Sequence, residues 1–198
     1  RYGGTITKTS SKSLTMATFS QSSLDNGSNC SLAAITRVLY YYNKNGYTKI
    51  SNDYKTIYSK VKKIAKKYGY TSRDGISATK INNVVNDVLK DYGYSKSNCK
   101  GIYVWNFKNQ VKKEIDNNRP VIMNIARGYY GNHTVTVCGY AIYKRSSKKS
   151  KISSNKTYNM IQVYDGWTTY KRFIDYSAFA YDLVTSGFGS FNTVTMKK

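Results

Sequence analysis

The chain has 198 residues, with 32 Lys or Arg against 10 Asp or Glu and a formal net charge of +22. This length suits one domain over residues 1–198, and a hydrophobic content of 40% excludes a disordered basic tail. No apolar run approaches the roughly 20 residues of a membrane-spanning helix, so we expect no membrane span. One histidine and three cysteines exclude a zinc site of paired Cys-x-x-Cys ligands.

The positive charge has two interpretations. A polyanionic partner such as nucleic acid, an anionic membrane or an anionic cell wall would explain it. Compositional drift in an AT-rich genome, in which Lys, Asn, Tyr and Ile rise together, would explain it equally well. The lysines are scattered along the chain, arginine is sparse and no nucleic-acid-binding motif is present. We therefore regard nucleic acid as an unlikely partner.

The first half of the chain predicts helices. Residues 1–12 lack apolar periodicity and predict a flexible lead-in, and Leu14–Phe19 predicts a strand. Turn formers then lead into a helix that opens at or near Cys30, capped by Ser28 or Asn29, and ends by Gly46. Apolar residues at helical spacing predict two more helices, over Asn52–Tyr68 and Ser77–Tyr92.

The second half predicts a sheet. A short strand at Ile102–Trp105 and a helix over Phe107–Asp116 come first. Strands rich in β-branched and aromatic residues follow at 121–126, 133–143, 160–164 and 191–195. A Ser- and Lys-rich loop, Lys144–Lys156, joins two of them as a mobile hairpin. Helices followed by strands indicate one α+β domain.

Cys30 is the first residue that could carry chemistry. The positive end of a helix lowers a cysteine pKa, and the thiolate is the nucleophile. The alternative is a small, inert cysteine that happens to begin a helix. The odd number of cysteines predicts at least one free thiol, and Cys99 and Cys138 could still form a disulfide.

His133 is the only histidine, so any imidazole base must be this residue. It opens an alternating strand and follows a glycine-containing loop, although a lone histidine often has no chemical role. A candidate nucleophile upstream and a single histidine about a hundred residues downstream fit the pairing of nucleophile and base in cysteine catalysis.

Asp165 is the candidate for the third residue, which would orient the imidazole. It ends the strand Met160–Tyr164. If that strand forms an antiparallel hairpin with the strand that begins at His133, its end lies beside His133. The alternative is a turn-forming Asp-Gly pair.

These three elements together resemble the papain-like cysteine peptidases, most closely the bacterial bacteriocin-exporter peptidases. The segment NGSNCSLAAITRVLYYY matches a cysteine that opens a helix, although Ser31 stands where a Gly often follows that cysteine. GNHTVTVCGYAIY matches the histidine strand, IQVYDGW the third strand end, and NNRPVIMNIA the strand before the histidine loop. The resemblance covers about residues 14–170. It implies a papain-like fold with helices from the N-terminal half packed on a mainly antiparallel sheet.

The resemblance also implies roles for single residues. Cys30 would be the nucleophile, His133 the base and then the acid, and Asp165 the orienting residue. The glutamine of the family's oxyanion hole maps onto Gln21. Because the gap from Gln21 to Cys30 is longer than usual, two further residues remain alternatives for this role, Asn26 and Asn29.

We therefore expect a cysteine-dependent hydrolase, a monomeric peptidase that cleaves peptide or isopeptide bonds through a thioester. Its substrates would be peptides or proteins, without a metal or organic cofactor. Peptidoglycan hydrolysis or transglutaminase-like acyl transfer would use the same chemistry. A non-enzymatic alternative is a basic module that binds an anionic polymer while Cys30 stays inert.

The first residue is Arg1 rather than Met, from which we expect a mature or excised fragment. We expect a bacterial protein that is secreted or held at the cell surface. The positive charge would draw it to an anionic cell envelope.

Overall fold

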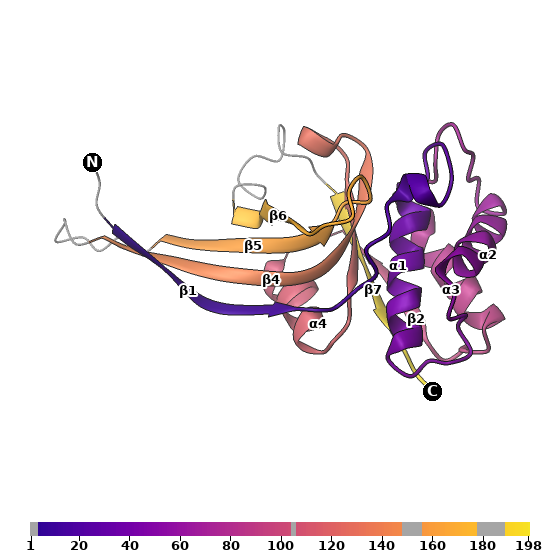
Figure 1. Ribbon diagram of the computed structural model, residues 1–198, viewed down its shortest axis with the longest axis horizontal. Coiled ribbons are helices and arrows are strands. Elements are labelled where there is room, and N and C mark those ends of the chain that lie inside the picture. The colour runs from indigo at the N-terminus through magenta and orange to yellow at the C-terminus, as the bar shows by residue number, and fades with distance from the viewer. Residues whose placement is uncertain (1–3, 104–105, 148–155, 178–188) are drawn as a thin grey trace.

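The computed structural model describes residues 4–103, 106–147, 156–177 and 189–198. Figure 1 shows the helices of the N-terminal half gathered at one end of the molecule and a sheet whose long strands project away from them. Among the described residues, no helix is long and apolar enough to cross a membrane.

The helices are α1 (Cys30–Lys44), α2 (Tyr54–Lys66), α3 (Ile81–Asp91) and the short α4 (Lys113–Asp116). Residues 31–39 of α1 are all buried, so α1 is a central helix, with α2 packed on one side and the sheet on the other, while α3 packs against α2. Helix α1 ends at Lys44, and Gly46, two residues further on, has a φ of +92° that favours glycine. The helices α2 and α3 bury one apolar stripe each and expose their lysines. The described residues also include four short helical turns: η1 (Gln21–Ser23), η2 (Ala78–Lys80), η3 (Phe107–Lys112) and η4 (Gly128–Tyr130).

Seven strands of the described chain form one antiparallel sheet in the order β2-β7-β3-β4-β5-β6, with β1 added alongside β4. Their bounds are β1 Gly4–Ser13, β2 Asn98–Ile102, β3 Val121–Ile125, β4 His133–Ser147, β5 Lys156–Tyr164, β6 Arg172–Asp175 and β7 Gly189–Thr195.

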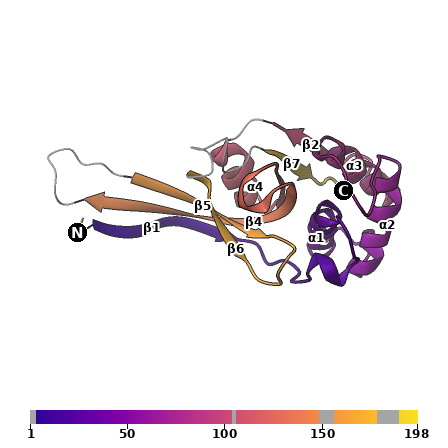
Figure 2. The same cartoon turned by 90° about the horizontal axis from the view of Figure 1, so that it is seen from above.

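The long strand β4 belongs to two parts of the sheet. Its first residues pair with β3, and residues 139–147 pair with β1, while β5 runs along its other side. As a result β1, β4 and β5 continue beyond the body as a three-stranded arm (Figures 1 and 2). The core lies between α1 and the strands β3, β4 and β7.

The predicted helices over residues 30–45, 52–68, 77–92 and 107–116 are confirmed, the last as the π-helical η3 followed by α4. The strands predicted at 121–126, 133–143, 160–164 and 191–195 are confirmed as well, although β4, β5 and β7 are longer. The α+β fold class predicted from the sequence is correct.

Four predictions need correction. The flexible lead-in is wrong for residues 4–12, which form β1. The strand predicted at Leu14–Phe19 is irregular, because the buried Arg37 guanidinium donates to the carbonyls of Ala17 and Phe19 at 3.1 and 2.5 Å. The strand predicted at 102–105 lies earlier, as β2, and residues 104–105 lie outside the described chain. Of the loop predicted at 144–156, residues 144–147 belong to β4 and Lys156 begins β5, whereas residues 148–155 lie outside the described chain.

Candidate active site

Cys30 is the first residue of α1, and the loop before it is firmly anchored. The side-chain amide of Asn29 donates both hydrogens, to the carbonyls of Gln21 and Asp25 at 2.9 and 3.0 Å. The amide N–H of Ser28 donates to the carbonyl of Ser72 at 2.8 Å. These contacts fix the position from which the thiol of Cys30 enters the cleft.

Gly27 is required for this close packing. Its φ is +113°, and a Cβ atom there would lie 2.4 Å from the carbonyl oxygen of Ser72. Only glycine allows the loop before Cys30 to approach the 71–75 turn so closely.

His133 begins β4, and its side chain is 7% exposed. Its Nε2 lies 2.6 Å from the main-chain oxygen of Asp165. A carbonyl oxygen only accepts hydrogen bonds, so Nε2 carries the proton in the neutral ring. Nδ1 is then the nitrogen that can accept a proton from Cys30.

The hairpin argument for Asp165 is confirmed, since β5 pairs antiparallel with β4 and its end returns to the start of β4. The atom that touches the imidazole is the main-chain oxygen, however, and the carboxylate points elsewhere. Its Oδ1 accepts from the N–H groups of Trp167 and Thr168 at 3.0 and 3.1 Å. Its Oδ2 lies 2.7 Å from Nε of Arg172. Asp165 is therefore both a turn-forming residue and a neighbour of the imidazole.

The three cysteines are free thiols with very different electrostatic surroundings. Burial acts to raise the pKa of Cys30, but the hydrogen bond and charge of His133 outweigh it, so this pKa is lowered. The N–H of Thr134 and the hydroxyl of Ser31 act in the same direction. Burial raises the pKa of Cys99 to about 12 and that of Cys138 to about 11. Among the three thiols, the surroundings of Cys30 are therefore the ones that favour the thiolate.

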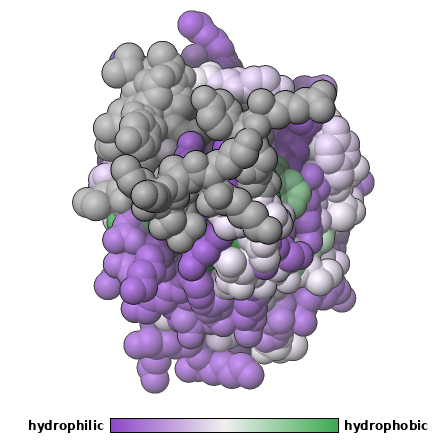
Figure 3. Space-filling model, turned by 90° about the vertical axis from the view of Figure 1, so that its left-hand side faces the viewer, coloured by the Kyte–Doolittle hydropathy of each residue, from purple (hydrophilic) through white to green (hydrophobic). Residues whose placement is uncertain are grey.

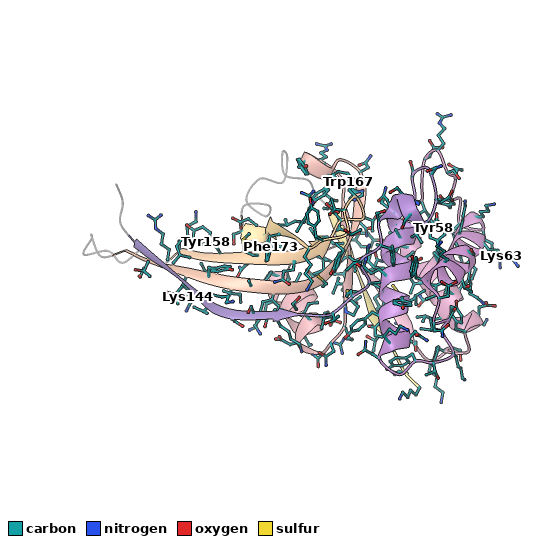
Figure 4. All side chains as sticks on the ribbon, viewed as in Figure 1. Tyr58, Lys63, Lys144, Tyr158, Trp167 and Phe173 are labelled. Carbon is teal, nitrogen blue, oxygen red and sulfur yellow. The ribbon has the colours of Figure 1, made fainter. Side chains whose placement is uncertain are left out.

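Aromatic rings surround the imidazole. The ring of Tyr130 stacks on His133 with centroids 5.5 Å apart and planes at 7°, and Trp167 lies 4.6 Å away on the same cluster. Tyr129 contacts both Tyr130 and Trp167. In Figure 4, Trp167 lies near the junction between the sheet and α1. These rings shield the contact between Nε2 and Asp165 from water, which strengthens that hydrogen bond.

Gln21 contacts both the loop before Cys30 and the turn after Asp165. Its N–H donates to the carbonyl of Gly166 at 2.7 Å, and its own carbonyl accepts from Asn29. The side-chain Oε1 is buried against Gly166, next to Asp165. Asn29 is the weaker alternative for an oxyanion donor, because both amide hydrogens are already used. Asn26 is exposed on the loop.

A cleft of about 560 Å³ opens at Cys30 and His133. One wall is formed by residues 74–78 together with Ser28, and the other by residues 124–126 and 132–134. The thiol of Cys30 and the imidazole of His133 therefore come from opposite sides of one cleft, the first from the helices and the second from the sheet.

A buried chain of polar side chains crosses the cleft floor, and sequence reasoning missed it. The Oγ of Ser31 lies 2.7 Å from Oγ1 of Thr134, which donates to Oδ1 of Asn124 at 2.9 Å. The amide of Asn124 donates in turn to Ser190 and Asn192 on β7, at 3.0 and 2.8 Å. The one sequence signal was Asn124 itself, a polar residue inside an otherwise apolar buried strand. Arg172 had no comparable signal.

Within the described ranges, no group of three or more His, Cys, Asp or Glu side chains could hold a metal ion. In a comparison with protein families, residues 13–182 match a family described as Peptidase C39-like. The chain belongs to the Peptidase C39-like family. Neither the curated proteins nor the solved structures gave a match.

Membership of the Peptidase C39-like family confirms the resemblance and the papain-like fold. It also supports a cysteine peptidase-type hydrolase. The family match says nothing about which residues react, so the roles within the site rest on the geometry described above.

Proposed function

We propose that the protein is a cysteine peptidase in which Cys30 is the nucleophile and His133 the general base and acid. The observation that carries the proposal is the selective lowering of the Cys30 pKa by His133 at the mouth of a cleft, while the other two thiols are buried with raised pKa values. Membership of a cysteine peptidase family agrees with this pairing.

The first half of the reaction forms an acyl-enzyme. Nδ1 of His133 takes the thiol proton, and the thiolate attacks the carbonyl carbon of the scissile bond. The imidazolium then protonates the leaving amine as the carbon–nitrogen bond breaks, which leaves a thioester on Cys30. Throughout, the Nε2–H of His133 donates to the main-chain oxygen of Asp165 and keeps the ring in place.

The second half regenerates the enzyme. His133 removes a proton from water, which attacks the thioester, and the returning proton restores the thiol as the acid product leaves. In both halves the oxyanion needs hydrogen-bond donors. The N–H of Cys30, at the first turn of α1, has no acceptor within the helix and can serve as one. The amide of Gln21 is the proposed second donor, supported by its position beside Asn29 and Gly166.

The proposed substrates are peptides or proteins, because the cleft is open and its floor offers polar groups to a main chain. The proposed setting is a bacterial surface or its exterior, where a chain of charge +22 would associate with an anionic envelope. The support for this setting is the charge alone.

Turnover assays on three substrates test the function. Wild type, Cys30→Ala, His133→Ala and Cys138→Ala are each incubated with a peptide mixture, with purified cell wall, and with an acyl donor plus a free amine. We expect new peptide amino termini from wild type and from Cys138→Ala, which removes a buried thiol outside the cleft. Cys30→Ala and His133→Ala should lose activity by roughly 10³-fold or more.

Two results would overturn the proposal. One is peptide cleavage by Cys30→Ala at the wild-type rate. The other is activity confined to cell wall or to amine transfer, which would replace peptide hydrolysis by one of those reactions.

A further inference from the structure

One face of the arm carries apolar and basic side chains beside one another. Residues directly opposite one another in an antiparallel pair share a face of the sheet. In one row, Ile6 pairs with Arg145, which pairs with Lys156. In the next row, Lys8 pairs with Tyr143, which pairs with Tyr158. Met160 and Phe173 continue the same face toward the body.

This apolar face is open to solvent. Ile6 is 61% exposed and Phe173 is 55% exposed, which is unusual for large apolar side chains. Five residues line one shallow concavity of about 360 Å³: Ile6, Tyr143, Tyr158, Met160 and Phe173. We call these five residues the arm patch.

The opposite face of the arm is different near the body. There Tyr140 packs edge-on against Phe107 of η3, with ring centroids 6.1 Å apart, and its hydroxyl donates to Asp116 of α4. Ile161 on that face is fully buried. The exposure of the arm patch is thus a property of one face, whereas the other face joins the core.

The charges beside the arm patch are mainly positive. Lys8 and Lys156 are exposed, and Nζ of Lys156 lies 5.1 Å from the centre of the Tyr158 ring. Arg145 stands between Ile6 and Lys156, and Asp175, an acidic residue, lies opposite Met160. Viewed along the arm, much of the surface around it is hydrophilic (Figure 3).

We propose that the arm patch docks on the surface of an anionic lipid bilayer. Apolar side chains would enter the boundary between headgroups and acyl chains, and the lysines beside them would reach anionic headgroups. Tyrosine rings suit that boundary because one end is apolar and the other polar. The positive charge of this face complements anionic headgroups. Its apolar side chains suit the acyl chains beneath them.

A protein partner fits this face less well. The central part of a protein interface is depleted of lysine, since a dry contact leaves its charge without water. Here two lysines adjoin the arm patch: Lys8 lies opposite Tyr143, and Nζ of Lys156 lies 5.1 Å from the centre of the Tyr158 ring. At a bilayer, long basic side chains can bury their methylene groups and keep the charged end in the headgroup layer.

Docking there would leave the cleft accessible. Tyr143 lies ten residues along β4 from His133, a separation of about 33 Å at the rise of a β-strand. In Figure 4, Tyr158 and Phe173 lie along the arm, and Trp167 lies nearer the helices. A protein held by its arm would therefore leave the cleft uncovered.

Vesicle cosedimentation tests the proposal. The probes are vesicles of phosphatidylcholine alone and vesicles with phosphatidylglycerol added, at physiological salt. We expect the wild-type protein to sediment with the anionic vesicles. The double variant Ile6→Ser/Phe173→Ser keeps every charge and should bind at least about tenfold more weakly, because two apolar side chains no longer enter the boundary.

A charge pair gives the matched control. Lys8→Gln/Lys156→Gln should weaken binding by about tenfold or more, whereas Lys63→Gln/Lys66→Gln, on the exposed side of α2, removes the same charge and should change binding by less than about threefold. Cleavage of a soluble peptide should be unchanged in all three double variants. Vesicle binding by Cys30→Ala is measured as well. This variant should bind vesicles as tightly as wild type does, so the docking test does not depend on the proposed peptidase function.

Three outcomes would overturn the proposal. They are no binding to anionic vesicles, equal binding by wild type and Ile6→Ser/Phe173→Ser, and equal losses in the two lysine pairs. The last two would show that net charge alone attracts the protein. Self-association that Ile6→Ser/Phe173→Ser abolishes, in the absence of vesicle binding, would replace the bilayer by a second copy of the chain.

Discussion

Replacing His133 by alanine should change the chemistry of Cys30 in a defined direction. In the native site, burial raises the pKa of Cys30, and the hydrogen bond and charge of His133 lower it by more. His133→Ala removes the lowering contributions and leaves burial in place. The Cys30 pKa should therefore move from below its ordinary value to above it.

The size of the effect follows from the thiolate fraction. A thiol with an ordinary pKa of about 8.5 is roughly 3% thiolate at pH 7, and each further pKa unit lowers that fraction about tenfold. Alkylation proceeds through the thiolate. We therefore expect Cys30 of His133→Ala to react at least about tenfold more slowly than wild type at pH 7, with the midpoint of its pH profile shifted upward.

Iodoacetamide labelling followed by peptide mass spectrometry, from pH 5 to pH 9, measures this rate. Cys99 and Cys138 serve as internal controls, because both are buried with pKa values raised to about 12 and about 11. In the native protein they should label far more slowly than Cys30, and in denaturant all three should label alike. An identical Cys30 profile in wild type and His133→Ala would refute the pairing of thiol and imidazole.

Substitutions at three further positions test the surroundings of the site. Asp165→Asn keeps the main-chain contact to the imidazole and an oxygen that accepts hydrogen bonds within the turn, so kcat/KM on one peptide should fall about threefold. Asp165→Ala removes those hydrogen bonds of the turn and should lower kcat/KM about 30-fold, a loss of about 2 kcal/mol. Arg37→Ala leaves the carbonyls of residues 17 and 19 without donors and opens a cavity, and urea unfolding should show a loss of about 4 kcal/mol; a loss below about 1 kcal/mol would contradict this account. Gly27→Ala should lower kcat/KM by more than Gly69→Ala, because both glycines have positive φ but only Gly27 would clash, with Ser72; equal activities would show that the close approach is unimportant.

The helices α2 and α3 could be predicted from the sequence because they are amphipathic. The apolar stripes of α2 and α3 repeat at helical spacing, and the lysines fill the opposite faces. β1 gave no such signal. Residues 5–9 are exposed, so no alternation of apolar and polar residues marks them as a strand. The segment Leu14–Phe19 has the buried apolar residues of a strand but is not one. Arg37 donates hydrogen bonds to its carbonyl groups, which a neighbouring strand would otherwise have bonded.

The part of the site that depends on the antiparallel pairing of strands could be predicted from the sequence. The hairpin of β4 and β5 was enough to place residue 165 beside His133. Which atom of Asp165 meets the imidazole depends on the turn at 165–168 and on Arg172, and no periodic pattern encodes either. The contact between Ser31 and Thr134 likewise depends on how α1 is rotated against the sheet, which sequence spacing does not determine.

The hydrogen bond between Ser31 and Thr134 joins the immediate neighbours of Cys30 and His133. Side chains alternate between the two faces of a strand, so a slip of β4 by one residue would turn His133 away and break this bond in the same step. A change in the rotation of α1 would do likewise. Loss of the hydroxyl contact and loss of the thiol–imidazole alignment are thus one event. Gentle heating should therefore abolish activity in step with any separation of the helices from the sheet, while the helices themselves remain folded.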